Sequence, residues 1–212
     1  MPRITVVPTD GSLGPRSRAS VDRLPLDVEV AGAGEARGDL LLFLESGDVL
    51  VASGVLALLA SLDTSGADAA VGSASTSGTP AALLTAVAAT SVDATPELLE
   101  HPTVAAVLWR RSWWEQQSLR WPDRPEQRRG VLARALAAAD AVDVLPEPVV
   151  EAQARSPRLR KAELHLRAED MAAVARGLDD LHDVAGSLPP ATRAHWYQNV
   201  LEPAISEALP GL

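Results

Sequence analysis

A run of five apolar residues that ends in an acidic turn limits most strongly what this chain can fold into. The run is Leu40 to Leu44, and residues 45 to 48 then read Glu-Ser-Gly-Asp. An unbroken apolar run of this length is typical of a strand that is buried on both faces of a parallel sheet. Carboxylates at the carboxyl end of such a strand lie where open α/β sheets bind ligands. The run therefore predicts a central strand, with Glu45 and Asp48 on one turn facing a cleft.

The remaining sequence alternates between strand and helix patterns, which predicts an α/β fold with a mainly parallel sheet and flanking helices. Strands are expected at Ile4 to Val7, Asp27 to Ala31, Ala67 to Gly72, Thr103 to Trp109 and Val142 to Leu145. Helices are expected at Pro15 to Leu24, Val49 to Leu62, Pro80 to Thr90 and Val131 to Ala141. Between the third strand and the third helix, the small polar residues from Ser73 to Thr79 predict a mobile loop.

The character of the chain changes near residue 156. A basic stretch is followed by an apolar stripe at helical spacing, and then by a last helix from Ala191 to Leu209. We therefore expect two units: residues 1–155 as an α/β domain, and residues 156–212 as a C-terminal helical extension. The helices of the extension pack either on the domain or on a second subunit, in which case the chain forms a homo-oligomer.

Composition and charge exclude several classes of protein. Hydrophobic residues make up 47% of the 212 positions, which is enough for a core, and the net charge is −9. A field of that sign argues against a nucleic-acid partner. The chain has no cysteine, no apolar run near the ~20 residues of a membrane span, and no hydrophobic signal segment. We expect a cytoplasmic protein, and the wealth of Ala, Arg, Gly and Pro indicates a bacterial source.

The stretch from Ala36 to Leu50 resembles the strand and D-x-D turn of the family 2 glycosyltransferases, which have the Rossmann-related GT-A fold. The family pattern is roughly A-R-G-x-y-l-l-f-L-D-s-D-D-x-L, and this chain departs from it at Glu45 and Gly47, where the family has Asp. Later stretches are similar in the same order, so that the resemblance covers Ala36 to Arg155. It implies that Glu45 and Asp48 hold Mg²⁺ or Mn²⁺ on the diphosphate of a nucleotide sugar.

Two residues are candidates for binding the donor. Asp10 stands in a Thr-Asp-Gly-Ser turn that is similar to the family turn whose Asp holds the base or ribose. The alternative is an ordinary loop acid in a turn. Arg37 is a candidate because guanidinium groups match phosphate geometry, and the alternative is a solvent-exposed loop arginine.

The candidates for the acceptor side and for catalysis lie further along the chain. Trp113, Trp114, Arg120 and Trp121 surround an element similar to the family's l-r-f, and indoles stack on sugar faces or fill a core. The family's catalytic base belongs to an E-D pair, which here is Glu126-Gln127. Since an amide is not a base, Glu126 or Asp123 would take this role. Alternatively, Asp123 caps a helix and Glu126 complements its dipole.

Three interpretations follow from these observations. The first is a glycosyltransferase that transfers a sugar from a nucleotide-sugar donor to an acceptor that the sequence does not name. The second is a non-catalytic binding or subunit protein on a degenerate GT-A scaffold, favoured by Gly47, Gln127 and a shortened nucleotide-binding half. The third is an unrelated α/β domain.

Overall fold

The apolar run forms strand β3 (Leu40–Leu44), and all five of its side chains are buried, which confirms the predicted central strand. The computed structural model describes residues 2–76, 79–80, 85–100, 106–122, 128–153, 182–183, 185–186, 188 and 190–202. Within these residues, β3 lies inside a mixed sheet. It pairs in parallel with β1 (Ile4–Pro8) on one side and antiparallel with β8 (Val107–Arg110) on the other.

Within the described residues the strand order is β2-β1-β3-β8-β5-β9-β4, with β6 paired to β5 and β7 paired to β9. The further strands are β2 (Val28–Val30), β4 (Val49–Leu50), β5 (Ala69–Thr76), β6 (Thr79–Pro80), β7 (Val87–Thr90) and β9 (Val142–Ala152). The pairings give β2, β1, β3, β5 and β9 one common direction, and β8 runs against them. This common direction confirms the α/β fold expected from the alternation of strands and helices.

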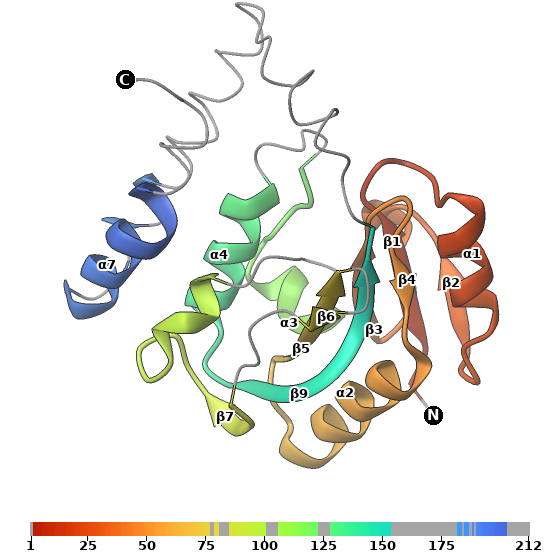
Figure 1. Ribbon diagram of the computed structural model, residues 1–212, viewed down its shortest axis with the longest axis horizontal. Coiled ribbons are helices and arrows are strands. Elements are labelled where there is room, and N and C mark those ends of the chain that lie inside the picture. Colours follow the sequence, from red (N-terminus) through yellow and green to blue (C-terminus); the bar gives the residue numbers. More distant parts are fainter. Residues whose placement is uncertain are drawn as a thin grey trace, which may run out of the picture.

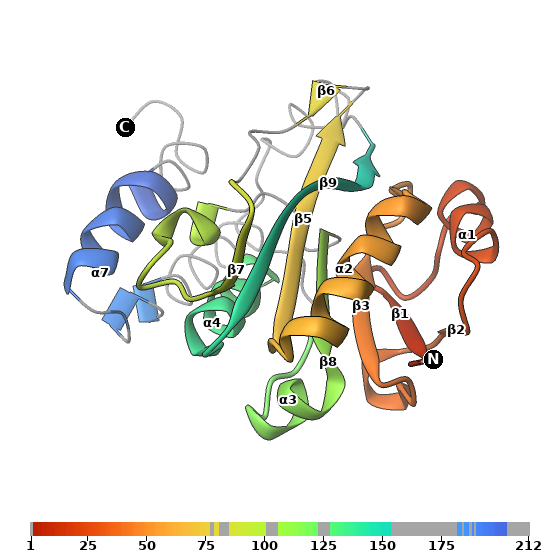
Figure 2. The same ribbon diagram turned by 90° about the horizontal axis from the view of Figure 1, so that it is seen from below.

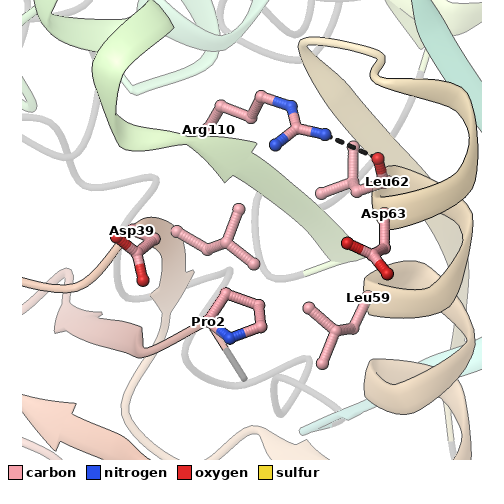
Figure 3. A pocket seen from close by; sticks show the side chains of 7 residues that line it. Pro2, Asp39, Leu59, Leu62, Asp63 and Arg110 are labelled. Atoms are coloured by element: carbon pink, nitrogen blue, oxygen red, sulfur yellow. Dashed lines mark hydrogen bonds between the residues drawn. The ribbon is translucent and has the colours of Figure 1, made fainter.

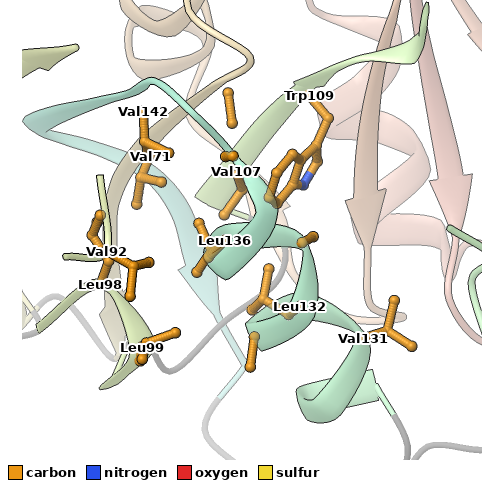
Figure 4. Close-up of a cluster of buried hydrophobic side chains, with 14 of the residues drawn as sticks. Val71, Val92, Leu98, Leu99, Val107, Trp109, Val131, Leu132, Leu136 and Val142 are labelled. Atoms are coloured by element: carbon orange, nitrogen blue, oxygen red, sulfur yellow. The ribbon is translucent and has the colours of Figure 1, made fainter. Parts of the chain in front are cut away.

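Helices cover both faces of the sheet (Figure 1 and Figure 2). One face packs against α1 (Pro15–Asp22) and α2 (Ala52–Ser65), which bury apolar side chains such as Val21 and Leu58 against the sheet. The opposite face packs against α3 (Arg111–Gln116), α4 (Arg128–Ala138) and the 3₁₀ helix η2 (Pro96–Glu100). Figure 4 shows this second core, where Leu132 and Leu136 of α4 pack against the sheet. The fold therefore has three layers.

The region from 73 to 90 differs from the prediction. Instead of a loop, residues 73–76 continue β5, because they pair with the second half of β9. The described part of the helix expected from Pro80 to Thr90 is not helical, because Pro80 lies in β6 and residues 87–90 form β7; residues 81–84 lie outside the described residues. Pairing with β9 and a hydrogen bond from the Ala89 N–H to Asp143 Oδ1 (2.8 Å) hold β7 in place and outweigh helix propensity.

Asp143 is a buried anchor for this region. Its Oδ2 accepts hydrogen bonds from the hydroxyls of Ser61 and Ser65, each at 2.6 Å, and both serines lie on α2. The side chain thus connects α2, β9 and β7. Burial raises the pKa of Asp143, but the hydrogen bonds from Ser61, Ser65 and the Ala89 N–H outweigh it and bring the pKa below its usual value.

Strand β9 is longer than the segment predicted from Val142 to Leu145. It continues through Pro146 and Pro148 to Ala152, and its register against β5 shifts in that region. Proline lacks an N–H and is tolerated at such irregular places in a sheet. The continuation carries the chain to Gln153, beside the acidic turn, which a strand ending at Leu145 would not do.

Further along, α7 (Pro190–Trp196) leads into a π-helical turn (Tyr197–Leu201), and the buried Trp196 belongs to the same core cluster as residues of η2 and α4. Helical packing on the domain is thus present there, while the boundary near 156 and the oligomer stay predictions, because residues 154–181 lie outside the described residues. No helix in the described part of the chain is long and apolar enough to cross a membrane.

Candidate functional site

The carboxyl ends of β1 and β3 bring two predicted site residues together. The parallel register places Pro8 opposite Leu44, and the Thr9 N–H donates to the Leu44 carbonyl at 3.0 Å. Glu45 directly follows β3, and Asp10 stands two residues after the end of β1. The Ser46 N–H donates to Asp10 Oδ2 at 3.2 Å, so that the two loops are joined directly. The carboxyl edge of the sheet therefore holds Asp10 and the Glu45 turn side by side.

The turn itself is tightly built. The Asp48 N–H donates to the Glu45 carbonyl at 3.2 Å, and Gly47 in the third position has a φ of +99°. A β-turn with positive φ at this position strongly favours glycine. The Gly47 N–H donates to Ser17 Oγ at 2.8 Å, and Ser17 is buried in α1. Helix α1 therefore fixes the turn from the outer side of the sheet.

A third side chain at this edge, Arg128, was not identified from the sequence. Its Nη2 donates to the Thr9 carbonyl at 2.6 Å and to Asp10 Oδ1 at 2.9 Å. Only 9% of the Arg128 side chain is exposed, whereas 42% of the Asp10 side chain is exposed. Arg128 begins α4, three residues before the predicted helix start, and nothing in the local sequence distinguishes it from its neighbour Arg129. The contact spans 118 positions of the chain, beyond the reach of local patterns.

Asp48 is buried and bonded to the residue that follows β9. It is only 5% exposed, and its Oδ1 accepts the Gln153 N–H at 2.9 Å. The Gln153 side chain also lies against Gly47, where an added Cβ would meet Gln153 Oε1. The place where the resemblance expects a second aspartate is therefore filled by Gln153.

Arg37 lies at the other edge of the sheet. It precedes the amino end of β3, so the five residues of that strand, about 16 Å of chain, separate it from Glu45. Its backbone N–H donates to Glu29 Oε1 at 2.6 Å, and its side chain is exposed. The structure does not bring Arg37 to the other candidates, and its exposed position agrees with the alternative of a loop arginine.

The tryptophans predicted for the acceptor side pack in the core or against it. Trp113 and Trp114 are buried, and their rings lie 5.4 Å from the ring of Trp109. Trp121 is half-buried and stacks on Phe43 with ring centroids 4.1 Å apart. Trp113 and Trp114 thus have no open face for a sugar, which corrects that interpretation in favour of core packing.

Of the three remaining candidates, the structure describes Arg120 and leaves out Asp123 and Glu126. Arg120 is exposed in the loop after α3. Asp123 and Glu126, the candidates for the catalytic base, lie outside the described residues. Their role as a base therefore stays a prediction.

Neither the models of known protein families nor the curated proteins give a match. Among solved structures, the chain is similar to residues 1–349 of S. aureus TarS, a glycosyltransferase, solved in complex with UDP-GlcNAc and with UDP. Each likeness has a TM-score of 0.60 and 10% identity, and it covers 98% of this chain and 90% of the other. A further structure of S. aureus TarS gives a TM-score of 0.58, with 55% of that chain covered.

The chain has a GT-A-like fold. At 10% identity the likeness shows the fold alone, and it agrees with the expectation from Leu40 to Leu44 and the acidic turn that follows. The GT-A-like fold also implies a divalent cation at the turn, and the side chains present can be tested for it. Mg²⁺ needs near-octahedral oxygen ligands, with one or two carboxylates beside the substrate phosphates.

One of the two carboxylates predicted to hold such a cation already has a hydrogen-bond partner in the protein. Asp48 is buried and is held by the Gln153 N–H, and Gly47 supplies no carboxylate. Within the described residues, no group of three or more His, Asp or Glu side chains is placed to hold a metal ion. The metal at Glu45 and Asp48 therefore stays a prediction from the resemblance, and we assign no chemical step to it.

A small cavity lies at the opposite edge of the GT-A-like sheet (Figure 3). Its volume is about 120 Å³, well below the ~300 Å³ of ordinary ligand pockets. The cavity is lined by Pro2, Asp39, Leu40, Leu59, Leu62, Asp63 and Arg110. Arg110 donates from Nη2 to the Leu62 carbonyl at 2.5 Å and from Nε to the Ala67 carbonyl at 2.7 Å. The guanidinium thus satisfies carbonyls at the end of α2, and the cavity is a structural feature of that helix end.

Proposed function

We propose that this protein is a glycosyltransferase that binds a nucleotide-sugar donor at the carboxyl edge of its sheet. The observation that carries the proposal is the meeting of Asp10 and the Glu45 turn at the ends of β1 and β3. This is where open α/β sheets bind ligands. The likeness to structures solved with UDP-GlcNAc and UDP supports the same ligand class.

In this proposal, Asp10 accepts hydrogen bonds from the base or ribose of the donor. The neighbouring Glu45 turn lies beside the diphosphate. Glu126 or Asp123 takes the proton of an acceptor hydroxyl, whose oxygen forms a bond to the anomeric carbon as the bond from that carbon to the diphosphate oxygen breaks. The nucleoside diphosphate then leaves, and the configuration of the sugar inverts.

A second candidate function is a binding protein on the same scaffold that has lost catalysis. Two observations favour it. The Gln153 side chain lies against Gly47 in the acidic turn. Gln127 stands at the position where the family's E-D pair has its acid. Such a protein would still bind the nucleotide portion through Asp10. A fold by itself does not decide between these two functions.

The deciding experiment measures turnover and binding together. Purified protein is incubated with a panel of nucleotide sugars, and release of the nucleoside diphosphate is followed with and without Mn²⁺. Turnover that is lost in Glu126→Gln or Asp123→Asn while donor binding persists supports the enzyme. Donor binding without turnover over the whole panel supports the binding protein, and absence of binding refutes both.

A further inference from the structure

We propose that Arg128 is a positioning residue for nucleoside recognition, because it fixes the orientation of the Asp10 carboxylate. This inference rests on the proposed function, in which Asp10 contacts the base or ribose. The two groups are 2.9 Å apart, and the same Nη2 also donates to the Thr9 carbonyl next to Asp10. Arg128 therefore contacts both the loop backbone and the carboxylate that the loop presents.

The burial of Arg128 requires an explanation. A guanidinium that is nine-tenths buried loses most of its hydration, and such a charge is normally matched by several hydrogen bonds. Here Nε is buried and has no hydrogen-bond partner among the described residues, so that the group is only partly compensated. A buried guanidinium that lacks a partner for one donor calls for an explanation, and its contacts with the Asp10 loop supply one.

The two oxygens of Asp10 are held from different sides. Oδ1 accepts from Arg128 on α4, and Oδ2 accepts from the Ser46 N–H in the acidic turn. Hydrogen bonds to both oxygens restrict the rotation of the carboxylate, while 42% of the side chain remains exposed to solvent. A carboxylate in a fixed plane is pre-organised to accept the N–H of a base or the hydroxyls of a ribose. Without Arg128, Oδ1 would lose this charged hydrogen bond.

Charge also supports a role for Arg128 in holding Asp10 and a role for Asp10 in contacting the nucleoside. Glu45 and Asp48 add two carboxylates to the same edge, so an isolated Asp10 would face like charges. The guanidinium of Arg128, 2.9 Å from Asp10 Oδ1, offsets the negative charge of Asp10. Because Arg128 is engaged with Asp10, it acts on the nucleoside through Asp10 rather than by direct contact with the diphosphate.

The test measures affinity by calorimetry with two probes, UDP and uridine. Uridine has no phosphate, so it separates nucleoside recognition from phosphate binding. We compare wild type, Asp10→Asn, Arg128→Gln, Arg128→Lys and the double variant Asp10→Asn/Arg128→Gln. Arg110→Gln is the matched control, because it removes an arginine bonded to carbonyls at the opposite edge of the sheet.

We expect Arg128→Gln and Asp10→Asn each to weaken both probes about tenfold or more, as loss of a charged hydrogen bond does. The double variant should bind no more weakly than the weaker single variant, because the two residues act in one step. Arg128→Lys should recover part of the affinity, since a single donor, Nη2, makes both contacts. Arg110→Gln should lower the melting temperature without changing either affinity.

Several results would overturn the inference while the proposed function stands. These are full affinity in Arg128→Gln, additive losses in the double variant, or a loss confined to UDP, which would mean direct phosphate contact. Absence of UDP binding by the wild type would refute the proposed function itself. If neither Arg128 variant folds, a crystal structure of the wild type with UDP decides: Arg128 on Asp10 supports the inference, and Arg128 on a phosphate overturns it.

Discussion

Replacing Gly47 by alanine should destabilise the protein by more than its backbone conformation alone explains. The φ of +99° costs a residue with a side chain about 1–2 kcal/mol. The added Cβ would also meet Gln153 Oε1, and moving that side chain out of its rotamer costs about 0.5–1.5 kcal/mol more. We therefore expect a total loss of about 1.5–3.5 kcal/mol in the free energy of unfolding.

A matched control separates the two contributions. Gly66 also has positive φ, +73°, but a Cβ there would meet nothing within 4 Å. Gly66→Ala should therefore show the backbone cost alone, about 1–2 kcal/mol. Urea unfolding measures both variants, each also made in a Gln153→Ala background. The excess cost of Gly47→Ala over Gly66→Ala should vanish in that background.

Two results would refute this reasoning about the turn. One is a Gly47→Ala variant that is no less stable than Gly66→Ala. The other is an excess cost that persists when Gln153 is replaced by alanine. Either result would mean that Gln153 does not occupy the space above the turn, and the argument against a carboxylate at position 47 would fall with it.

Three further predictions concern the frame around the site. The lowered pKa of Asp143 means that its stabilisation is present above its unfolded-state pKa of about 3.9 and is lost as the pH falls. Below about pH 5, wild-type unfolding free energy should therefore fall more steeply than that of Asp143→Asn in urea titrations; parallel curves would contradict this. Arg110→Gln should lower stability by about 1.5–3 kcal/mol, because carbonyls at the end of α2 lose a charged donor, and an unchanged melting temperature would show that water replaces it. Trp114→Ala removes a buried core side chain and should lower the free energy of unfolding by about 3–5 kcal/mol, measured by urea unfolding. A UDP titration is the check: lost UDP affinity at unchanged stability would indicate that Trp114 contacts the ligand.

The sequence was informative where a pattern is local. Leu40 to Leu44 predicted a doubly buried strand, because an unbroken apolar run has few other stable environments. The acids that follow β3 were predicted to lie at a ligand-binding edge, and Asp10 was a candidate only from the similarity of its turn to a family turn. The parallel pairing of β1 and β3 brings Asp10 and the Glu45 turn to the same edge. Both predictions, the buried strand and the acids at its carboxyl end, follow from residues that are neighbours in the sequence, together with the parallel order of the strands.

The parts that failed depend on distant contacts. Helix propensity favoured a helix from Pro80 to Thr90, but pairing of β7 with β9 and the Asp143 anchor decide its structure. Arg128 reaches Asp10 from another layer of the fold, and Gln153 reaches Gly47 only because β9 continues past two prolines. Arg37 precedes β3 while Glu45 follows it, so the strand itself separates two residues that chemistry alone would group together.

Hydrogen exchange with and without UDP tests the location of the site most directly. If the nucleotide binds at the carboxyl edge of the sheet, amides of residues 9–12 and 45–48 should exchange more slowly in the presence of UDP. Amides around Asp39 and Arg110, which line the small cavity at the opposite edge, should be unaffected. Protection at that opposite edge, or no protection anywhere at saturating UDP, would contradict the account.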